Sequence, residues 1–317
     1  MKICQDIDLF EPLPYAVVTS GTFDGIHLGH QKILKRLQEI AARNNGETVV
    51  LTYWPHPRLV LNPKDTSIKL LNTFAEKSEL LDQLGVNHLV CIPFTKSFSE
   101  MSSDEFTRNI LVRKLGTRKL VIGYDHHFGK NREGNFDQLK KVGPAIGFEV
   151  EEIPRQDIDE SAISSSAIRR FLTEGSVKKA AQLLGRPYFI EGKVVPGQKI
   201  GRQIGFPTAN ISLEKSEDPD SVFKLIPGEG IYAVKIQVDH QWLEGMLYIG
   251  SRPTIGPGQQ VIEVNIFDFD RQIYDRSVGI QFIDRIRGDV KFDSLEALQK
   301  QLHIDRSDTL RILRPGH

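Results

Sequence analysis

The sequence changes its pattern near residue 185, and this change restricts the possible folds more than any other feature. Before that point, short β-branched runs alternate with amphipathic helical stretches, which is typical of parallel strands joined by crossover helices. Beyond it, extended segments are separated by glycine and proline. Gly185 can end a helix in the left-handed conformation, and Pro187 prevents its continuation. We therefore expect two domains, 1–185 and 186–317, as the length of 317 residues suggests.

The first domain is predicted to be an α/β domain, Rossmann-like, with a doubly wound parallel sheet. Strands are expected at 15–19, 48–53, 88–92, 119–122 and 148–153, with helices between them. The helix over 28–44 is expected to end with Gly46 as a left-handed cap. Capping boxes, Thr73 with Glu76 and Ser102 with Glu105, predict two further helix starts. In such a fold the ligand binds at the carboxyl ends of the strands.

The second domain is predicted to be an antiparallel β-barrel followed by a C-terminal helix. Five segments, 188–195, 230–238, 243–250, 261–269 and 278–286, have the length and composition of strands. Regularly spaced short strands favour a closed barrel. The final helix is expected to be capped by Asp293 with Glu296, and its apolar positions include Leu298 and Leu302.

The composition excludes several classes of function. Lys plus Arg and Asp plus Glu both number 41, so no global field would hold the chain to nucleic acid or to an anionic membrane. No stretch approaches the roughly 18 apolar residues that span a bilayer, and none resembles a signal peptide. Cys4 and Cys91 are too few for a disulfide framework. We expect a cytoplasmic protein that acts on small molecules, and the sequence gives no indication of its oligomeric state.

Residues 21–30, GTFDGIHLGH, lie between the first predicted strand and the first helix, where such folds bind phosphates. His27 and His30 are three residues apart, so both imidazoles face the same side of the first turn. Fixed donors at this position suit a triphosphate that is attacked at its α-phosphorus. The alternative is that the glycines only shape a turn and the histidines cap the helix.

A second segment, 163–170, reads ISSSAIRR and places hydroxyl groups and an arginine at another predicted helix start. Hydroxyl groups with a guanidinium form a phosphate clamp. Taken alone, the segment is equally well explained as a helix cap with a solvated arginine.

Together these segments resemble the H-x-G-H and I-S-S-T-x-I-R motifs of the nucleotidyltransferase superfamily. Over nearly its whole length the chain resembles the bifunctional riboflavin kinase/FMN adenylyltransferase family, including Pro55-His56-Pro57 and the segment 121–134. His126 stands where that family usually has phenylalanine, and Ser166 where it usually has threonine. The resemblance implies that His27 and His30 are catalytic and that Asp125 helps to place the nucleoside. It implies a site for ATP and its phosphates that also contains Gly21, Phe23, Asp24, Gly29, Ser164, Ser165 and Arg169.

The second predicted site lies in 197–210, GQKIGRQIGFPTAN. The sequence contains no P-loop, so a kinase on this chain would bind ATP by another device. Glycines such as Gly201 can expose backbone amides to a nucleotide. Thr208 and Asn210 point the same way on an extended strand and are suitable ligands for Mg²⁺, although a polar edge strand would look the same.

The segment 197–210 also matches the riboflavin kinase signature of the same family, G-x-x-x-G-R-x-x-G-F-P-T-A-N. On the alternating strand 261–269, Glu263 shares a face with Asn265, which stands where histidine is common in the family. The resemblance implies that Glu263 takes the proton from a ribityl hydroxyl as it attacks the γ-phosphate of ATP.

The sequence thus predicts a bifunctional enzyme of FAD biosynthesis. Its barrel would phosphorylate riboflavin to FMN with ATP and Mg²⁺, and its first domain would adenylate FMN to FAD and release pyrophosphate. Two alternatives remain at this point. The chain could retain only one of the two activities, or it could be a non-catalytic flavin-binding regulator.

Overall fold

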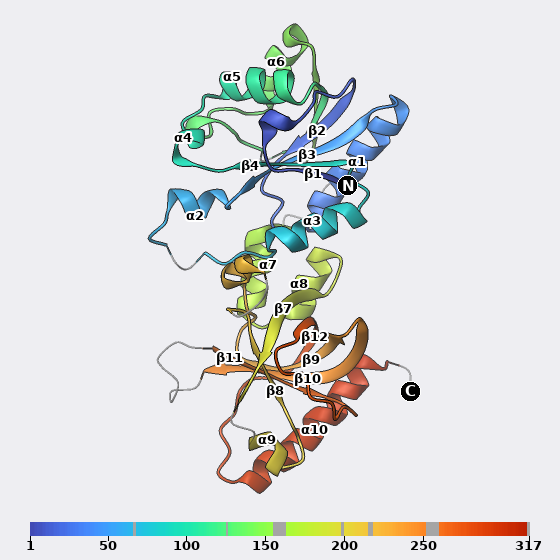
Figure 1. Ribbon diagram of the computed structural model, residues 1–317, viewed down its shortest axis with the longest axis vertical. Helices are drawn as coiled ribbons and strands as arrows, with labels where there is room; N and C mark the ends of the chain where they lie inside the picture. The colour runs from blue at the N-terminus through green and yellow to red at the C-terminus, as the bar shows by residue number, and fades with distance from the viewer. Residues whose placement is uncertain are drawn as a thin grey trace. The chain divides into compact units, whose positions relative to one another are not determined.

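A computed structural model describes residues 1–65, 68–124, 126–154, 163–197, 200–214, 218–251 and 260–315. The chain divides into two compact units, Met1–Ser164 and Ser165–His317 (Figure 1). Two helices that precede residue 185, α7 (Ser165–Thr173) and α8 (Val177–Leu184), belong to the second unit. The position at which the chain can be cut into separately folding domains stays a prediction.

The first unit is built on a parallel sheet, as the sequence predicts, but it has six strands and not five, because Lys2–Cys4 adds an edge strand. Its order is β1-β4-β3-β2-β5-β6, so the chain proceeds outward from β2 on one side and resumes at β5 on the other. The carboxyl end of β2 is therefore the point at which the strand order reverses, where doubly wound sheets bind ligands. The strands are β1 (Lys2–Cys4), β2 (Ala16–Ser20), β3 (Glu47–Trp54), β4 (His88–Pro93), β5 (Thr117–Gly123) and β6 (Glu149–Ile153).

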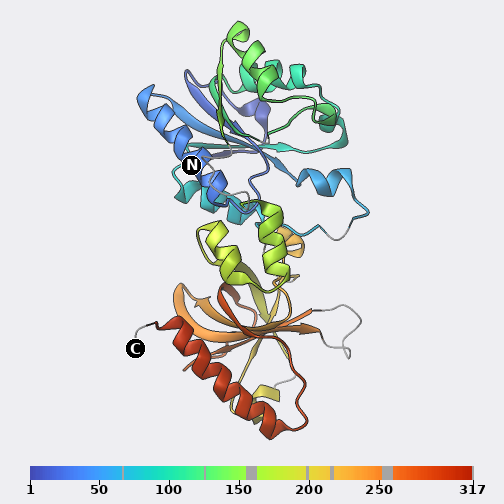
Figure 2. The ribbon, with the colours of Figure 1, turned by 180° about the vertical axis from the view of Figure 1, so that it is seen from behind.

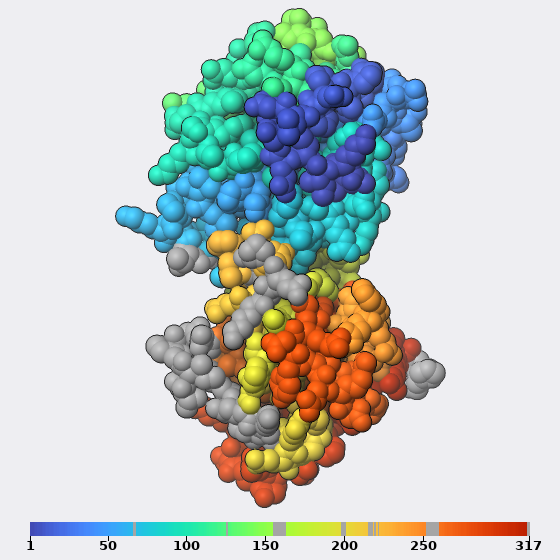
Figure 3. Space-filling model, in the orientation of Figure 1, coloured from blue at the N-terminus to red at the C-terminus, as the bar shows by residue number. Residues whose placement is uncertain are grey.

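Helices cover both faces of this sheet because its strands are apolar on both sides. One face packs against α1 (Leu28–Arg43) and α3 (Phe74–Gln83), and the other against the π-helix η2 (Phe106–Lys114) and α6 (Phe136–Val142). The chain's first residues lie at the surface of this unit (dark blue in Figure 3). The shorter helices are η1 (Ile7–Leu9), α2 (Pro57–Leu61), α4 (Lys96–Ser99), α5 (Ser103–Glu105), η3 (Lys130–Arg132) and η4 (Gly143–Ile146).

The predicted helix starts are confirmed, whereas one predicted helix end is wrong. Thr73 and Ser102 both form complete capping boxes. At the end of α1, the left-handed residue is Asn45, with φ of 51°, and not Gly46. Gly46 instead approaches the Tyr15 carbonyl so closely that an added Cβ would lie 2.6 Å from that oxygen. Gly46 still donates its N–H to the Ala41 carbonyl at 2.9 Å, so it closes the helix through its backbone while Asn45 takes the left-handed position.

The second unit is a closed barrel with the order β10-β11-β8-β7-β12-β9, in which all neighbours are antiparallel. Predicted strands are confirmed, but the one expected over 261–269 ends at Ile266. Along the chain, the short strand β8 and its two flanking helices come between β7 and β9, whereas in the barrel β8 pairs with β11 and β7. The elements are β7 (Tyr188–Val195), α9 (Ile200–Gln203), β8 (Ala209–Ser212), η5 (Pro219–Phe223), β9 (Gly230–Val238), β10 (Gln241–Ser251), β11 (Gln260–Ile266) and β12 (Ser277–Arg287).

The C-terminal helix α10 (Leu295–Leu313) lies along the outside of the barrel (Figure 2). Its N-cap is Ser294, whose hydroxyl accepts from the Ala297 N–H, so the predicted cap at Asp293 is wrong by one residue. The guanidinium of Arg287, at the end of β12, holds the fully buried Asp305 of this helix by hydrogen bonds of 2.8–3.2 Å. A buried ion pair of this kind fixes the helix because an unpaired Asp305 would be costly.

The hairpin of α7 and α8 is attached to the barrel by hydrogen bonds between main-chain groups and one arginine. Gly228 donates its N–H to the Leu172 carbonyl at 2.8 Å. Arg285 of β12 donates to the carbonyls of Glu174 and Glu229, at 3.3 and 2.6 Å. Gly185 adopts the predicted left-handed conformation at the end of α8, with φ of 73°.

Candidate active sites

The loop between β2 and α1 has a strained backbone held by its own packing. Phe23, Gly25 and Ile26 all have positive φ angles, of 47°, 87° and 39°. For a β-branched residue such as Ile26 this conformation is an outlier that costs about 1–3 kcal/mol. Ile26 is fully buried, and it packs with Phe23 and Leu34 in one apolar cluster. Strain supported in this way is characteristic of functional loops.

This loop delivers His27 to the N-cap position of α1. The His27 side chain is 8% exposed, and its Nδ1 accepts from the His30 N–H at 3.4 Å. The two imidazole rings are stacked, with centroids 3.7 Å apart and planes 15° apart. The ring of His30 also contacts Phe23, at 4.9 Å between centroids. The structure thus brings His27, His30 and Phe23 together, as the sequence predicts.

Asp24 in the same loop is turned toward the chain itself. Its Oδ1 accepts from the N–H groups of Leu71 and Asn72, at 2.9 and 3.3 Å, and the side chain is 3% exposed. These contacts give Asp24 a positioning role between the loop and the segment before α3. Its predicted role in ATP binding stays a prediction. Gly21 follows β2, and Gly29 is buried in the first turn of α1.

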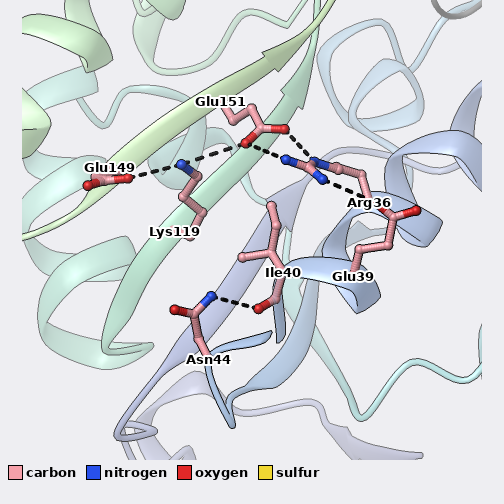
Figure 4. Close-up of polar contacts among 7 residues, drawn as sticks. All are labelled: Arg36, Glu39, Ile40, Asn44, Lys119, Glu149 and Glu151. Atoms are coloured by element: carbon pink, nitrogen blue, oxygen red, sulfur yellow. Dashed lines mark hydrogen bonds and ion pairs between the residues drawn. The ribbon is translucent and has the colours of Figure 1, made fainter. Parts of the chain in front are cut away.

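Helix α1 is anchored to the far edge of the sheet by an ionic network (Figure 4). Arg36 donates to both carboxylate oxygens of Glu151 on β6, at 2.6 and 3.3 Å, and to Glu39 at 3.1 Å. Lys119 of β5 bridges Glu149 and Glu151, at 3.0 and 3.6 Å. The hydrogen bonds from Arg36 hold the pKa of Glu151 below its usual value. The helix that presents His27 is therefore fixed to β6 near its middle, at Arg36.

His126 stands where the resembled family usually has phenylalanine, and it provides an uncharged aromatic ring at that position. Its ring stacks on Phe128, with centroids 5.7 Å apart and planes 28° apart. Burial, with smaller contributions from His127 and Arg132, lowers the pKa of His126 to about 4. At neutral pH the imidazole is therefore uncharged and, like phenylalanine, offers a planar aromatic ring. The neighbouring Asp125 lies outside the described residues.

The serine-rich segment spans the division between the units. Ser164 is the last residue of the first unit, and Ser165 and Arg169 lie in the first two turns of α7 in the second. Their predicted cooperation with His27 and His30 on ATP phosphates stays a prediction.

The second site centres on Thr208, Asn210 and Glu263. The Thr208 hydroxyl donates to Glu263 Oε2 at 3.2 Å. Asn210 of β8 is the register partner of Glu263 on β11, so their side chains are neighbours on one face of the barrel wall. A Cβ at Gly197 would collide with the Asn210 amide, which explains that glycine. The structure thus brings together the three residues that sequence analysis selected.

A glycine turn places Thr208 in this position. Phe206 donates its N–H to the Gly201 carbonyl at 2.8 Å, and a Cβ at Gly201 would collide with the Phe206 carbonyl. Asn265, which is 8% exposed, donates its Nδ2 to the Pro207 carbonyl at 2.6 Å. The role of Asn265 as the support of this turn was not found from sequence. The alternation of β11 placed it beside Glu263, but no sequence signal indicated a partner 58 residues away.

A cavity of about 360 Å³ opens beside Thr208. Apolar side chains, among them Val194 and Val264, form much of its wall, and Arg202 and Arg271 contribute positive charge. Tyr274 also lines it. An apolar wall with cations at the rim suits a ligand that combines a planar ring with phosphates.

The oxygen atoms of this site fit a magnesium ion that also binds phosphates. A threonine hydroxyl has one donor and two lone pairs, so Thr208 can donate to Glu263 and still coordinate a cation. The carboxamide oxygen of Asn210 is a second hard ligand. Among the described residues there is no group of three or more His, Cys, Asp or Glu side chains arranged for a metal ion. The Thr208 and Asn210 oxygens are the kind of ligand that Mg²⁺ accepts, since this ion needs few protein ligands when phosphates supply the rest.

Comparisons with known proteins match both halves of the chain. Residues 11–167 match the FAD synthetase family model, and residues 184–313 match the riboflavin kinase model. A Listeria monocytogenes protein described as a bifunctional riboflavin kinase/FMN adenylyltransferase is 40% identical over 294 residues, 92% of this chain and 91% of the relative. A Bacillus subtilis protein of the same description is 36% identical over 301 residues, 93% of this chain and 92% of the relative.

A solved structure shares the fold of this chain. It is a macrolide-efflux protein from Streptococcus pneumoniae, 30% identical, with a TM-score of 0.85 and 97% of both chains covered. Within the described part of the present chain, no helix is long and apolar enough to cross a membrane.

Proposed function

The chain belongs to the family of bifunctional riboflavin kinase/FMN adenylyltransferases, and from this premise we propose how its residues divide the two reactions. The enzyme transfers the γ-phosphoryl group of ATP to riboflavin, which gives FMN. It then transfers the adenylyl group of a second ATP to FMN, which gives FAD and pyrophosphate. We assign the first reaction to the barrel and the second to the parallel-sheet unit.

In the kinase reaction, Glu263 is the general base. Its carboxylate accepts the proton of the terminal ribityl hydroxyl, whose oxygen then attacks the γ-phosphorus while ADP leaves. The hydrogen bond from the Thr208 hydroxyl to Oε2 fixes the orientation of the Glu263 carboxylate. The observation that carries this assignment is the cluster of Thr208, Asn210 and Glu263 on neighbouring strands.

The nucleotide of the kinase reaction is assigned to the cavity beside Thr208. The apolar wall with Tyr274 suits an adenine ring, and Arg202 and Arg271 suit the phosphates. Thr208 and Asn210 would hold Mg²⁺. When bound, this ion neutralises charge on the phosphate oxygens. Asn265 contacts no substrate in this assignment. Its role is to hold the turn that positions Thr208.

In the adenylyl transfer, His27 is assigned to the phosphates of ATP. Because its Nδ1 accepts from the His30 N–H, the neutral ring carries its proton on Nε2. That Nε2–H is a fixed donor at the N-terminus of α1, where the helix dipole also favours anions. Such donors stabilise the charge that develops as pyrophosphate leaves. We assign Ser164, Ser165 and Arg169 to the same phosphates.

Incubation of the pure protein with riboflavin, ATP and Mg²⁺, with chromatographic separation of the flavins over time, tests the assignment of both reactions to one chain. FMN is expected first and FAD later, with two ATP consumed per FAD. Accumulation of FMN without FAD would contradict an active first unit. Failure to convert riboflavin, with FAD still formed from added FMN, would contradict an active barrel.

The two unpaired cysteines, Cys4 and Cys91, fit the cytoplasmic location expected from the sequence.

A further inference from the structure

A row of side chains that includes Glu263 runs from strand to strand along one face of the barrel wall. Across neighbouring strands, Asn210 pairs with Glu263, Glu263 with Tyr248, Tyr248 with Ile231 and Ile231 with Arg287. Residues directly opposite each other in antiparallel strands lie on the same face, with Cβ atoms about 4.5–5.5 Å apart. The order of this row therefore gives the order of groups on either side of the proposed base.

The proposed nucleotide and metal groups lie on one side of Glu263. Asn210 is its neighbour on β8, and Thr208, which lines the cavity, donates to its carboxylate. The neighbour of Glu263 on the other side is Tyr248 of β10. Phosphoryl transfer proceeds with the attacking and leaving oxygens roughly in line. If ATP approaches Glu263 from the Asn210 side, riboflavin must approach from the Tyr248 side.

The surroundings of Tyr248 give its ring a defined direction. A Cβ at Gly250 would coincide with the phenol oxygen, so the ring extends along β10 over that glycine. The hydroxyl donates to Asp289 Oδ2 at 3.1 Å, in the segment between β12 and α10. The inner part of the side chain packs against the apolar cluster of Phe206, Met246 and Phe267. The ring is half-buried and held at both ends.

We propose that Tyr248 is the residue that positions riboflavin for phosphorylation, by placing its aromatic face against the flavin so that the ribityl chain runs toward Glu263. This inference rests on the assignment of Glu263 as the base. A half-buried phenol suits a flavin because it offers a flat apolar surface at little cost in side-chain entropy, since its two torsions are already fixed. Gly250 is then needed to leave room for the ring.

Two substitutions separate the ring from the hydroxyl group. Tyr248→Leu keeps apolar contact with Phe206 and Met246 but removes the flat face, and Tyr248→Phe keeps the face. Riboflavin binding is measured without ATP, by titration of flavin fluorescence. Tyr248→Leu is expected to raise the Kd for riboflavin at least tenfold, about 1.4 kcal/mol, while the KM for ATP stays within twofold. Tyr248→Phe is expected to stay within threefold for both.

The outcomes that contradict the proposal are specific. An increase in the KM for ATP with an unchanged Kd for riboflavin would show that ATP, and not riboflavin, lies on the Tyr248 side of Glu263. Unchanged values for both substrates would show that Tyr248 contacts neither. The assignment of Glu263 as the base is tested separately. Glu263→Gln is expected to lose phosphorylation of riboflavin but to keep the wild-type Kd for riboflavin. If Glu263→Gln stays active, the assignment of the base fails, and the Kd of Tyr248→Leu still decides the role of the tyrosine.

A test on the unaltered enzyme covers the case in which Tyr248→Leu does not fold. Tetranitromethane nitrates accessible tyrosines, and mass spectrometry of peptides locates the modified residues. Riboflavin is expected to protect Tyr248, whereas Mg²⁺ with ADP is expected to protect Tyr274 in the cavity. Tyr274 is 38% exposed and serves as the matched control. Nitration of Tyr248 at the same rate with and without saturating riboflavin would overturn the proposal.

Discussion

Replacement of Asn265 by alanine tests whether a buried hydrogen bond positions the kinase site. The Asn265 amide donates to the Pro207 carbonyl at 2.6 Å, and its side chain is 8% exposed. The substitution leaves that carbonyl without its partner, a loss of about 1–3 kcal/mol. For a unit of this size, each kcal/mol corresponds to roughly 2–4 °C in Tm, so the barrel transition is expected to move down by several degrees.

The effect on activity is expected to be larger than the effect on stability. A displacement of about 1 Å in a positioned group can reduce a rate roughly 10²-fold, and Thr208 follows Pro207 directly. Phosphorylation of riboflavin by Asn265→Ala is expected to fall by about that factor, whereas conversion of added FMN to FAD is expected to stay near wild type. Asn265→His, which restores an N–H donor, is expected to recover much of the loss.

The control for this experiment is a variant of Gln299, whose side chain contacts the same turn. Gln299 of α10 is exposed and donates to the Ile204 carbonyl at 3.2 Å, so Gln299→Ala removes a contact that water can replace. Both reactions are expected to stay within twofold in that variant. Riboflavin phosphorylation within threefold of wild type in Asn265→Ala, with an unchanged Tm, would refute the positioning role of Asn265.

Three other expectations concern the remaining sites. His27→Asn keeps an N-cap for α1 but removes the imidazole, so FAD formation should fall by about 10²–10³-fold with FMN formation unchanged, and an equal loss of both products would assign His27 to the wrong reaction. Because the pKa of His126 is lowered to about 4, the unfolded chain binds more protons between pH 6.5 and 4, and acid should destabilise the first unit over that range by up to about 3 kcal/mol. Denaturant unfolding of His126→Phe should show a smaller loss of stability than wild type over the same range, and identical pH dependence in both proteins would contradict the lowered pKa of His126. A fragment of residues 186–317 is expected to fold and make FMN, with a lower Tm than residues 165–317, because it lacks the α7–α8 hairpin held by Arg285 and Gly228; equal Tm values would show that the hairpin does not stabilise the barrel.

The predictable parts of this fold were those that depend on local sequence. Strands were recognised from β-branched runs, and the starts of α3 and α5 from capping boxes, because each signal spans only a few residues. The cap of α10 was misplaced because Asp293 and Ser294 are both good N-caps, and the backbone alone decides which one is used. At the end of α1, Asn45 took the left-handed position that was expected for Gly46.

The unpredicted parts depend on contacts between distant residues. No propensity favours a left-handed Ile26, and only its burial against Leu34 and its neighbours explains it. Asp24 was selected for ATP, but its contacts with Leu71 and Asn72 lie 47 and 48 residues away. The row from Asn210 to Tyr248 depends on the register of three strands, which the sequence does not specify.

Two assays of Glu263→Gln test whether the two reactions take place at separate sites, with Glu263 as the base of the kinase reaction only. The substitution keeps the size of the side chain but removes its basicity, so riboflavin phosphorylation is expected to fall by about 10²–10⁴-fold. Added FMN bypasses the kinase, and the same preparation is therefore expected to convert it to FAD at the wild-type rate. Riboflavin phosphorylation within a few-fold of wild type would contradict the assignment of Glu263 as the base, and a parallel loss of FAD formation from FMN would contradict the separation of the two sites.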